Sequence, residues 1–302
     1  MLQIQNKKLA VTIFCLSALY LTWGVVYLSI KFALESFPPV LLSSIRYICA
    51  GMFILLWVFF VQKDFKLPNF HQLKIIFITS LCMIVIGGAF LNVSGMYINS
   101  GTVALLMGSF PLWMVIISWF LGYDKRPSLT VFTGLVGGFI GVIALAVSTG
   151  HTGGSNAVLG IIFLFISLFG WLIGSIYSKR HEFGMSMLKS LGFQMVIGGL
   201  VMFVLSVLIG EWSNFSFSQV TLKSFLSAVH LIFFGSIVGY TCYFWLLHNT
   251  PTHIAISYAY AEPVIAVIVG YLFGGEHIYP STLFACTLII ISVFFVIKGK
   301  TS

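Results

Sequence analysis

A single acidic residue lies deep inside an apolar segment of this sequence. Glu262 belongs to the stretch Tyr258-Ala259-Tyr260-Ala261-Glu262-Pro263, roughly 15 Å from either end of the surrounding apolar span at about 1.5 Å per residue. A charge at the centre of a bilayer costs about 2.5 to 3.5 kcal/mol on insertion scales. The carboxyl must therefore face protein or water, find a partner, or hold a proton. Either a functional site or a helix-packing role explains its presence.

Arg46 is the basic residue that is best placed by depth to meet this carboxyl. It lies near the start of the second apolar span, only about 5 Å from the midplane and within reach of an extended side chain. Tyr258 precedes Glu262 by four residues and therefore shares its helix face. We predict that Glu262 and Tyr258 face Arg46. The alternative for Arg46 is a structural tether to helix-end carbonyls.

The segment around Glu262 also contains a proline, and a matching segment lies earlier in the chain. Pro263 and Pro111, the latter in Leu105-Leu106-Met107-Gly108-Ser109-Phe110-Pro111, are 152 residues apart. Each proline lacks a backbone donor and crowds the carbonyl four residues earlier, those of Met107 and Ala259. We predict two proline-broken helices whose freed carbonyls line a cavity or act as hinges. Kinked packing without a cavity is the alternative.

Aromatic and polar side chains recur in other apolar spans. Trp23 and Tyr27 share a face of the first span, and although such stripes are more often packing than ligand boxes, they could line the same cavity. The predicted substrate-binding residues are Glu262, Tyr258, Arg46, Trp23, Tyr27, Asn92, Trp171 and Tyr243.

No catalytic residue, metal or cofactor is expected. The five cysteines lie inside predicted helices without metal-ligand spacing, and we expect buried free thiols. The histidines are scattered, mostly at the ends of loops, so an intramembrane enzyme is disfavoured.

The composition is that of a polytopic membrane protein. Apolar residues make up 59% of the chain, charged residues 7%, and the mean hydropathy is +1.07, whereas globular proteins have roughly 25% charged residues. The net charge of +8 comes from residues dispersed at the ends of apolar segments, which argues against a nucleic-acid partner. The predicted spans are 9–32, 39–61, 74–97, 100–122, 128–148, 157–178, 186–209, 222–247, 252–273 and 281–298.

The distribution of lysine and arginine predicts the orientation. With the N-terminus inside, only Lys31, Arg46 and Lys223 fall off the cytoplasmic side. Both termini are therefore expected in the cytoplasm, in a multi-pass protein of the cell (inner) membrane. The first span lacks a small-residue cleavage site, so we expect a retained helix.

The chain reads as an internal duplication. Beside the prolines, Val115-Ile116 matches Val267-Ile268 and Asp124 matches Glu276, and at an offset of 148 residues Trp23 matches Trp171 and Gly51 matches Gly199. The predicted repeats are 1–148 and 149–302, joined by a glycine-containing linker at 148–156. Because five spans are an odd number, the second repeat is expected to be inverted in the membrane.

These features resemble the EamA-type permeases of the drug/metabolite transporter superfamily. The resemblance rests on the paired repeats, Trp23-Gly24, Arg46, Ser109-Phe110-Pro111, the Tyr258 to Pro263 stretch and Gly274-Gly275-Glu276. It implies a bundle of ten helices in which the first, third, fourth, sixth, eighth and ninth surround a central cavity. The fifth and tenth helices are expected at the periphery. It also implies export of small metabolites, amino acids or toxic compounds.

The predicted function is that of a secondary transporter working by alternating access. No phosphate-binding glycine loop occurs, so the energy source is expected to be a gradient rather than ATP. Proton antiport through Glu262 is one possibility, since a carboxyl can bind either a proton or the substrate. Pairing with Arg46 would favour the charged carboxylate and make Glu262 a poor proton carrier, so facilitated diffusion stays open as well. The expected partners are a small-molecule substrate, the lipid bilayer and protons in the antiport case, in a monomer or homodimer. A proton-coupled multidrug exporter is the alternative function, and a channel has no positive support.

Overall fold

The regular elements of the described residues are all helices. The computed structural model describes residues 2–63, 66–98, 103, 106–123, 125–149, 156–273 and 280–298. The predicted linker glycines, Leu105, Asp124 and the Gly274-Gly275-Glu276 motif lie outside these ranges. Among the described residues, seven helices are long and apolar enough to cross a membrane, and three shorter apolar helices cover 110–120, 129–141 and 286–296. These ten segments fall within the ten predicted spans or overlap them closely; the exact arrangement of ten spans stays a prediction.

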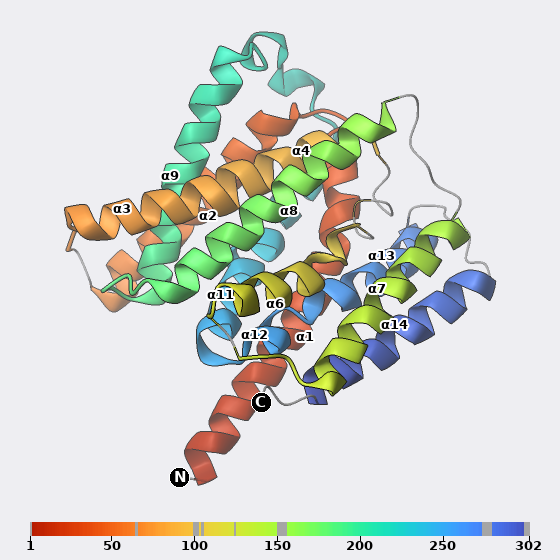
Figure 1. Cartoon of the computed structure of the whole chain (residues 1–302). Coiled ribbons are helices and arrows are strands. Elements are labelled where there is room, and N and C mark those ends of the chain that lie inside the picture. Colours follow the sequence, from red (N-terminus) through yellow and green to blue (C-terminus); the bar gives the residue numbers. More distant parts are fainter. Residues whose placement is uncertain are drawn as a thin grey trace. The chain divides into compact units, whose positions relative to one another are not determined.

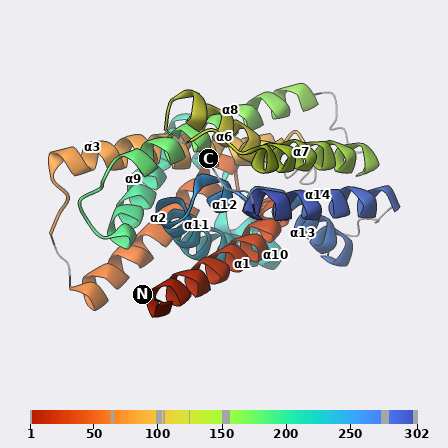
Figure 2. The ribbon, with the colours of Figure 1, turned by 60° about the horizontal axis from the view of Figure 1, so that its bottom comes forward.

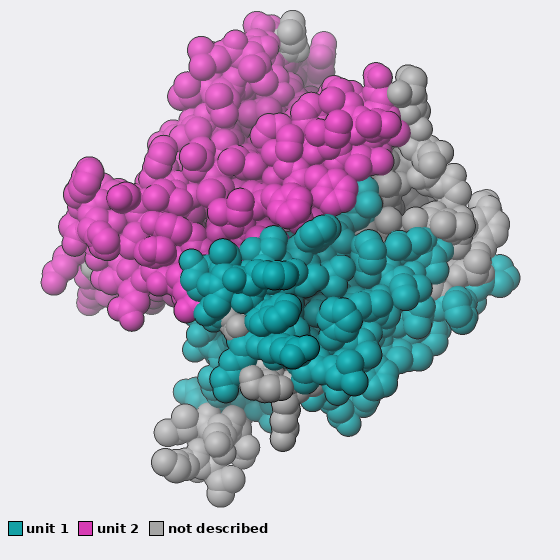
Figure 3. All heavy atoms as spheres, in the orientation of Figure 1, with its two compact units in different colours: residues 1–28, 99–152, 242–302 teal, residues 29–98, 153–241 magenta. Residues whose placement is uncertain are grey.

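The chain forms two compact units, and each combines segments from both sequence halves. Unit 1 contains residues 1–28, 99–152 and 242–302, and unit 2 contains residues 29–98 and 153–241 (Figure 3). The unit boundaries cut across two helices, α1 and α11. The compact units are therefore not the two predicted repeats.

Unit 1 contains most of α1 and the two helices that include Pro111 and Pro263, together with the helices that come next in each half of the sequence (Figure 1). Its elements are α1 (Leu2–Ala33, up to Leu28), α6 (Phe110–Phe120), α7 (Leu129–Thr149), α11 (Gly239–Asn249, from Cys242), α12 (Thr252–Ala255), α13 (Tyr258–Phe273) and α14 (Pro280–Lys298). Helices α7 and α14 lie side by side (Figures 1 and 2). A Cβ on Gly134 would lie 2.9 Å from Cγ2 of Val296, and one on Gly137 would lie 2.9 Å from Oγ of Ser292. Gly134 and Gly137 of α7 thus serve helix contacts within the chain.

Unit 2 contains the predicted spans 39–61, 74–97, 157–178 and 186–209 and most of the span 222–247. Its elements are α2 (Pro39–Trp57), η1 (Val58–Gln62), α3 (Phe70–Thr79), η2 (Ser80–Ala89), α4 (Phe90–Ser94), α8 (Ala157–Arg180), α9 (Met187–Leu208), η3 (Trp212–Asn214), η4 (Phe217–Gln219), α10 (Leu222–His230) and η5 (Leu231–Val238). Helix α2 packs along α9, and η2 packs along α8. Asn69 and Gln72 begin α3 with a reciprocal pair of hydrogen bonds, each 2.9 Å long.

Two stretches of π-helix occur at corresponding places in the two sequence halves. η2 widens the third predicted span over residues 80–89, and η5 widens the eighth over residues 231–238. Their starts are 151 residues apart, close to the offset between the matching prolines. π-helical turns are uncommon and often lie at functional sites. Hydropathy alone predicts such spans only as plain helices.

The matching glycines Gly51 and Gly199 lie at reciprocal places in the α2–α9 pair. A Cβ on Gly51 would lie 2.8 Å from the carbonyl oxygen of Gly192, and one on Gly199 would lie 2.8 Å from the amide nitrogen of Ile48. The two helices therefore approach backbone to backbone and run in opposite directions. Opposite directions also follow from the α7–α14 contacts. Both agree with spans that alternate across the membrane.

Two sequence expectations about single residues need correction. Four cysteines are buried or half-buried as expected, but Cys49 is exposed, because it lies on the outer side of α2, opposite the face that packs on α9. Pro263 does not break its helix: α13 continues through it from Tyr258 to Phe273. The interruption comes earlier, at Ile256 and Ser257, where α12 ends.

The first-half segment is interrupted at a different point relative to its proline. Pro111 lies in the first turn of α6, directly after a turn at Gly108 and Ser109. A proline is well tolerated there because the first helical amides have no partner inside the helix. Ser109 donates a hydrogen bond from Oγ to the carbonyl oxygen of Leu106 over 2.7 Å. The two prolines match in sequence but not in their place in the helix.

Candidate functional site

The buried carboxyl of Glu262 has a hydroxyl as its hydrogen-bond partner in unit 1. Tyr27 of α1 donates from its hydroxyl to Oε2 of Glu262 over 2.8 Å. Glu262 is only 2% exposed. A buried polar group without such a partner is strongly destabilising. The sequence predicted both residues for the site, and the structure brings them into contact.

Tyr27 reaches this position because α1 presents one buried face at a four-residue spacing. Cys15, Leu19, Trp23 and Tyr27 are all buried, and side chains four apart lie above one another on a helix. Tyr258 and Glu262 show the same spacing on α13. Trp23 meets Tyr258 with ring centroids 4.8 Å apart in an edge-on arrangement. The two helices therefore meet in two successive contacts, Trp23 with Tyr258 and Tyr27 with Glu262.

These paired contacts also give the relative direction of the two helices. Both residue numbers increase together from the first contact to the second, so α1 and α13 run in the same direction. This is the relation expected for the first and ninth of ten alternating spans.

A third aromatic ring completes the cluster. Tyr243 of α11 lies 5.6 Å from the ring of Trp23 and 5.5 Å from the ring of Tyr258. All three are buried, and the pairs with Tyr258 are edge-on, which is a favoured geometry for aromatic pairs. Five of the eight predicted substrate-binding residues thus form one cluster, the α1–α13 cluster: Trp23, Tyr27, Tyr243, Tyr258 and Glu262.

Gly24 permits the close approach of α1 and α13. A Cβ at this position would lie 2.5 Å from Cγ2 of Ile265 and 2.6 Å from its Cβ. Any other residue would therefore force the helices apart beside the Tyr27–Glu262 hydrogen bond. Trp23-Gly24 was part of the sequence motif, but the reason for the glycine appears only in the packing.

Two further tyrosines anchor the region around the cluster. The hydroxyl of Tyr20 on α1 is hydrogen-bonded over 2.8 Å to Ser257, in the turn between α12 and α13. Tyr260 of α13 donates to the carbonyl oxygen of Leu135 on α7 over 3.0 Å. Ala259, which was predicted to line the cavity by its carbonyl, is buried beside them. Ser257 was missed by sequence reasoning because nothing near it in the chain marks it as a partner of α1.

Arg46 has its described contacts within unit 2. Its Nε donates to Oγ of Ser236 in η5 over 2.7 Å, and its guanidinium carbon lies 5.0 Å from the centre of the Tyr47 ring. Arg46 is 5% exposed. Because Arg46 and Glu262 belong to different units, their pairing stays a prediction. Ser236 and Tyr47 were not predicted, although Ser236 lies in the π-helical stretch that hydropathy cannot reveal.

Trp171 and Tyr240 extend this second group of side chains. The hydroxyls of Tyr47 and Tyr240 are 2.6 Å apart, and the rings of Trp171 and Tyr240 meet edge-on at 5.1 Å. His230 lies near Arg46 and is hydrogen-bonded at Nδ1 to Ser29 over 3.0 Å. This group of side chains in unit 2 therefore has a buried cation, Arg46, with aromatic rings and hydroxyl groups around it.

Asn92 occupies a separate place in unit 2. Its Nδ2 donates to Oγ of Ser43 over 2.7 Å and to the carbonyl oxygen of Pro39 over 3.2 Å. Its Oδ1 is buried and has no hydrogen-bond partner among the described residues. Asn92 therefore has a structural role, because its side-chain amide is bonded to the start of α2. A role of Asn92 in binding substrate stays a prediction.

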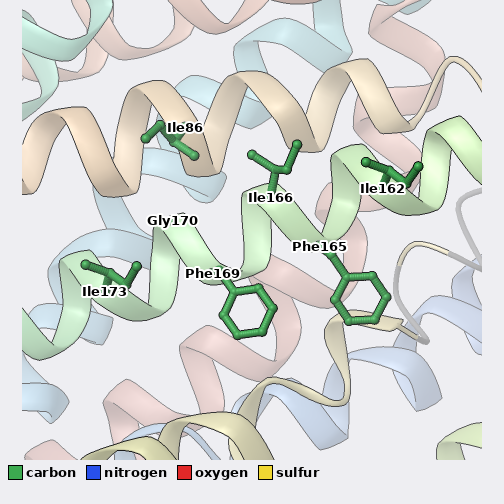
Figure 4. Close-up of a pocket in the computed structure, with 7 residues that line it drawn as sticks. All are labelled: Ile86, Ile162, Phe165, Ile166, Phe169, Gly170 and Ile173. Carbon is green, nitrogen blue, oxygen red and sulfur yellow. The ribbon is translucent and has the colours of Figure 1, made fainter.

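An apolar groove on unit 2 does not have the chemistry of the predicted site. Its volume is about 500 Å³, and it lies between η2 and α8, where its lining is entirely apolar (Figure 4). The lining residues are Ile86, Ile162, Phe165, Ile166, Phe169, Gly170 and Ile173. Nothing there can orient a polar solute. Within the described ranges there is also no group of three metal-ligating side chains.

The long apolar helices and the buried polar side chains are those of a membrane protein with a candidate site for a solute. Comparison with known proteins agrees: the model of the EamA-like transporter family matches residues 10–147 and 158–298. Two matched regions imply two repeated halves. This chain belongs to the EamA-like transporter family and is a transporter, not an enzyme.

The similarity to individual relatives extends over most of the chain. The inner membrane transporter YedA of Escherichia coli K12 is 30% identical over 286 residues, which cover 94% of this chain and 90% of YedA. The transporter YvbV of Bacillus subtilis 168 is 24% identical over 289 residues, 93% of this chain and 90% of YvbV. A solved crystal structure with 18% identity superposes with a TM-score of 0.76 over 96% of this chain and 98% of the other, which shows a shared fold.

Proposed function

We propose that this protein is a secondary transporter that exports small organic metabolites, amino acids or amphipathic compounds by alternating access. The observation that carries the proposal is the Tyr27–Glu262 hydrogen bond inside a packed aromatic cluster. A carboxyl 2% exposed in an apolar span is costly to retain for packing alone. Intramembrane ionisable residues most often mark a substrate or ion pathway.

The chemistry of the α1–α13 cluster favours a substrate with an amino group and an apolar body. Glu262 supplies a carboxylate, and the rings of Trp23, Tyr243 and Tyr258 supply apolar and cation-binding surfaces. Arg46, Asn92 and Trp171 are proposed to contribute from unit 2. Arg46 would then receive a substrate carboxylate, which its planar guanidinium suits. Met107, Ala259 and the two prolines are proposed as hinge or cavity backbone.

The second candidate function is that of a proton-coupled exporter of several amphipathic compounds. The neutral hydroxyl of Tyr27 supports it, since a carboxyl beside a neutral donor can exchange a proton for a cationic substrate.

The proposed setting is the inner membrane, as the name of YedA states for that relative. We propose two inverted repeats, 1–148 and 149–302, with both termini in the cytoplasm. A monomer is favoured over a homodimer because Gly134 and Gly137 are used within the chain.

Reconstitution in proteoliposomes tests the proposal. Purified protein is assayed for uptake and counterflow of amino acids, cationic amphiphiles and organic acids, with and without a pH gradient. We expect at least one class of solute to be transported, and Glu262→Gln to reduce that transport about tenfold or more, whereas Glu182→Gln, in an exposed loop, leaves it unchanged. Silence across the panel with folded protein, or full activity of Glu262→Gln, would contradict the proposal. A pH gradient that drives uptake distinguishes proton antiport from facilitated diffusion.

A further inference from the structure

A second cavity lies in unit 1, at the end of the bundle where α6, α7 and α12 meet. Its volume is about 240 Å³. The buried side chains of Val115 and Val131 give it an apolar floor, and Pro251 lies exposed at its edge. The remaining lining residues are polar: Tyr123, Lys125, Thr252 and His253. Thr252 and His253 are buried, whereas Lys125 is exposed. The cavity is thus apolar at its base and has a cation at its mouth.

The charge of this cavity is positive among the residues that the structure describes. None of its described lining residues is acidic, and Lys125 is followed by Arg126, whose guanidinium carbon lies 6.0 Å from the centre of the Trp119 ring. The loop segment Tyr123-Asp124-Lys125-Arg126 carries a net charge of +1 in sequence. Hydroxyl groups on Tyr123 and Thr252 add neutral hydrogen-bonding capacity. This combination of groups recognises an anion with several acceptor oxygens.

The position of the cavity in the chain places it at the membrane boundary. Helix α6 ends at Phe120, α7 begins at Leu129, α11 ends at Asn249 and α12 begins at Thr252. Tyrosine, tryptophan and basic side chains at such helix ends are typical of the lipid headgroup region. Basic pockets between transmembrane helices hold phosphate-bearing head groups. The apolar floor would accommodate the carbon atoms that adjoin the phosphate.

We propose that this cavity binds a phosphate group, carried either by an anionic phospholipid or by free phosphate. Lys125 meets the charge at the mouth, and Thr252 and His253 contact the group from the buried wall. The occupant would hold the α6–α7 loop against α12. This site is separate from the α1–α13 cluster and does not depend on the identity of the transported solute.

Binding to the purified full-length protein tests the proposal by native mass spectrometry and thermal unfolding. The probes are phosphatidylglycerol, phosphatidylcholine and inorganic phosphate. We expect retention of phosphatidylglycerol or protection by inorganic phosphate, and the comparison of these two arms identifies the source of the phosphate. Lys125→Gln is expected to lower the affinity about fivefold. Lys74→Gln, which removes an exposed lysine of α3, should leave the affinity within about twofold if the effect is local.

Thr252→Val distinguishes the cavity from general surface charge. The substitution keeps the side-chain shape but removes a buried hydroxyl, so it should weaken binding without changing the net charge. Unchanged binding by Thr252→Val, equal losses in Lys125→Gln and Lys74→Gln, or binding of neither phosphate probe by the wild-type protein would each overturn the proposal.

Discussion

Tyr27 and Glu262 are 235 residues apart in the sequence, and the tyrosine hydroxyl lies 2.8 Å from the carboxylate oxygen. The contact joins the first helix to a helix of the second sequence half. It is the only polar contact that the described residues give to Glu262. Changes on either side of it are therefore expected to affect both stability and transport.

Tyr27→Phe removes the donor and leaves the buried carboxyl without a partner. We expect it to lower the free energy of unfolding by about 1 to 3 kcal/mol, the typical cost of an unsatisfied buried group. Glu262→Gln keeps an acceptor for Tyr27, so its effect on stability should be smaller than its effect on transport. Thermal unfolding of Tyr27→Phe, of Glu262→Leu, which removes the acceptor, and of the double variant measures the coupling. Additive losses in that cycle would show that the two side chains do not interact.

Gly24→Ala is expected to separate α1 from α13. The new methyl group would lie 2.5 Å from Ile265, and such overpacking costs about 1 to 3 kcal/mol. Transport should fall as well, because the Tyr27–Glu262 contact lies one turn away. Ile265→Ala in the same chain should restore part of the stability. Gly87→Ala is a matched control, since its methyl group would meet no atom closer than 3.4 Å; an equal loss there would contradict the steric explanation.

Glu211 caps the start of α2 and is expected to matter for stability. Its carboxylate accepts hydrogen bonds from the amides of Val40 and Leu41 over 3.2 and 2.8 Å, and from Ser206 over 2.9 Å. Glu211→Ala should lower the free energy of unfolding by about 1 to 3 kcal/mol, because it leaves helix-start amides without an acceptor. Chemical or thermal unfolding measures this. Glu182→Ala removes a comparable charge from an exposed loop and should change the stability by less than about 0.5 kcal/mol.

The ion pair between Lys223 and Glu35 should contribute little. Its side chains are 52% and 42% exposed, and pairs of this kind are worth about 0 to 1 kcal/mol. Lys223→Ala is therefore expected to leave the unfolding temperature nearly unchanged, and added salt should reduce any remaining difference. A large loss of stability would mean that this end of the molecule depends on the pair.

Arg46→Ala is expected to impair transport, and Ser236→Ala should distinguish positioning from charge. Ser236 accepts the Nε hydrogen bond of Arg46, so its removal leaves the charge in place and changes the orientation of the guanidinium. A raised KM with kcat nearly unchanged is the expected result for Ser236→Ala in transport kinetics. Arg46→Lys should restore less than half of the lost transport, because an ammonium cannot reproduce the planar fork. Wild-type kinetics in Arg46→Ala would remove this residue from the mechanism.

The periodic features of this chain were predictable, and the long-range contacts were not. Four-residue spacing correctly placed Trp23 with Tyr27 and Tyr258 with Glu262 on common faces, and composition placed the apolar spans. The partner of Glu262 could not be chosen from depth alone, because Tyr27, Arg46 and other polar groups lie in several spans at similar heights. Glu211 was missed because its role depends on a loop returning to a distant helix start.

The four-residue spacing on both α1 and α13 has a consequence for motion. A slide of one helical turn, about 5.4 Å, would move Tyr20 to the place that Gly24 occupies opposite Ile265. Even a single Cβ there would lie 2.5 Å from Cγ2 of Ile265, so the larger side chain closes that register. The two helices are therefore expected to move together as one rigid pair, and not to slide past each other, whenever either of them moves.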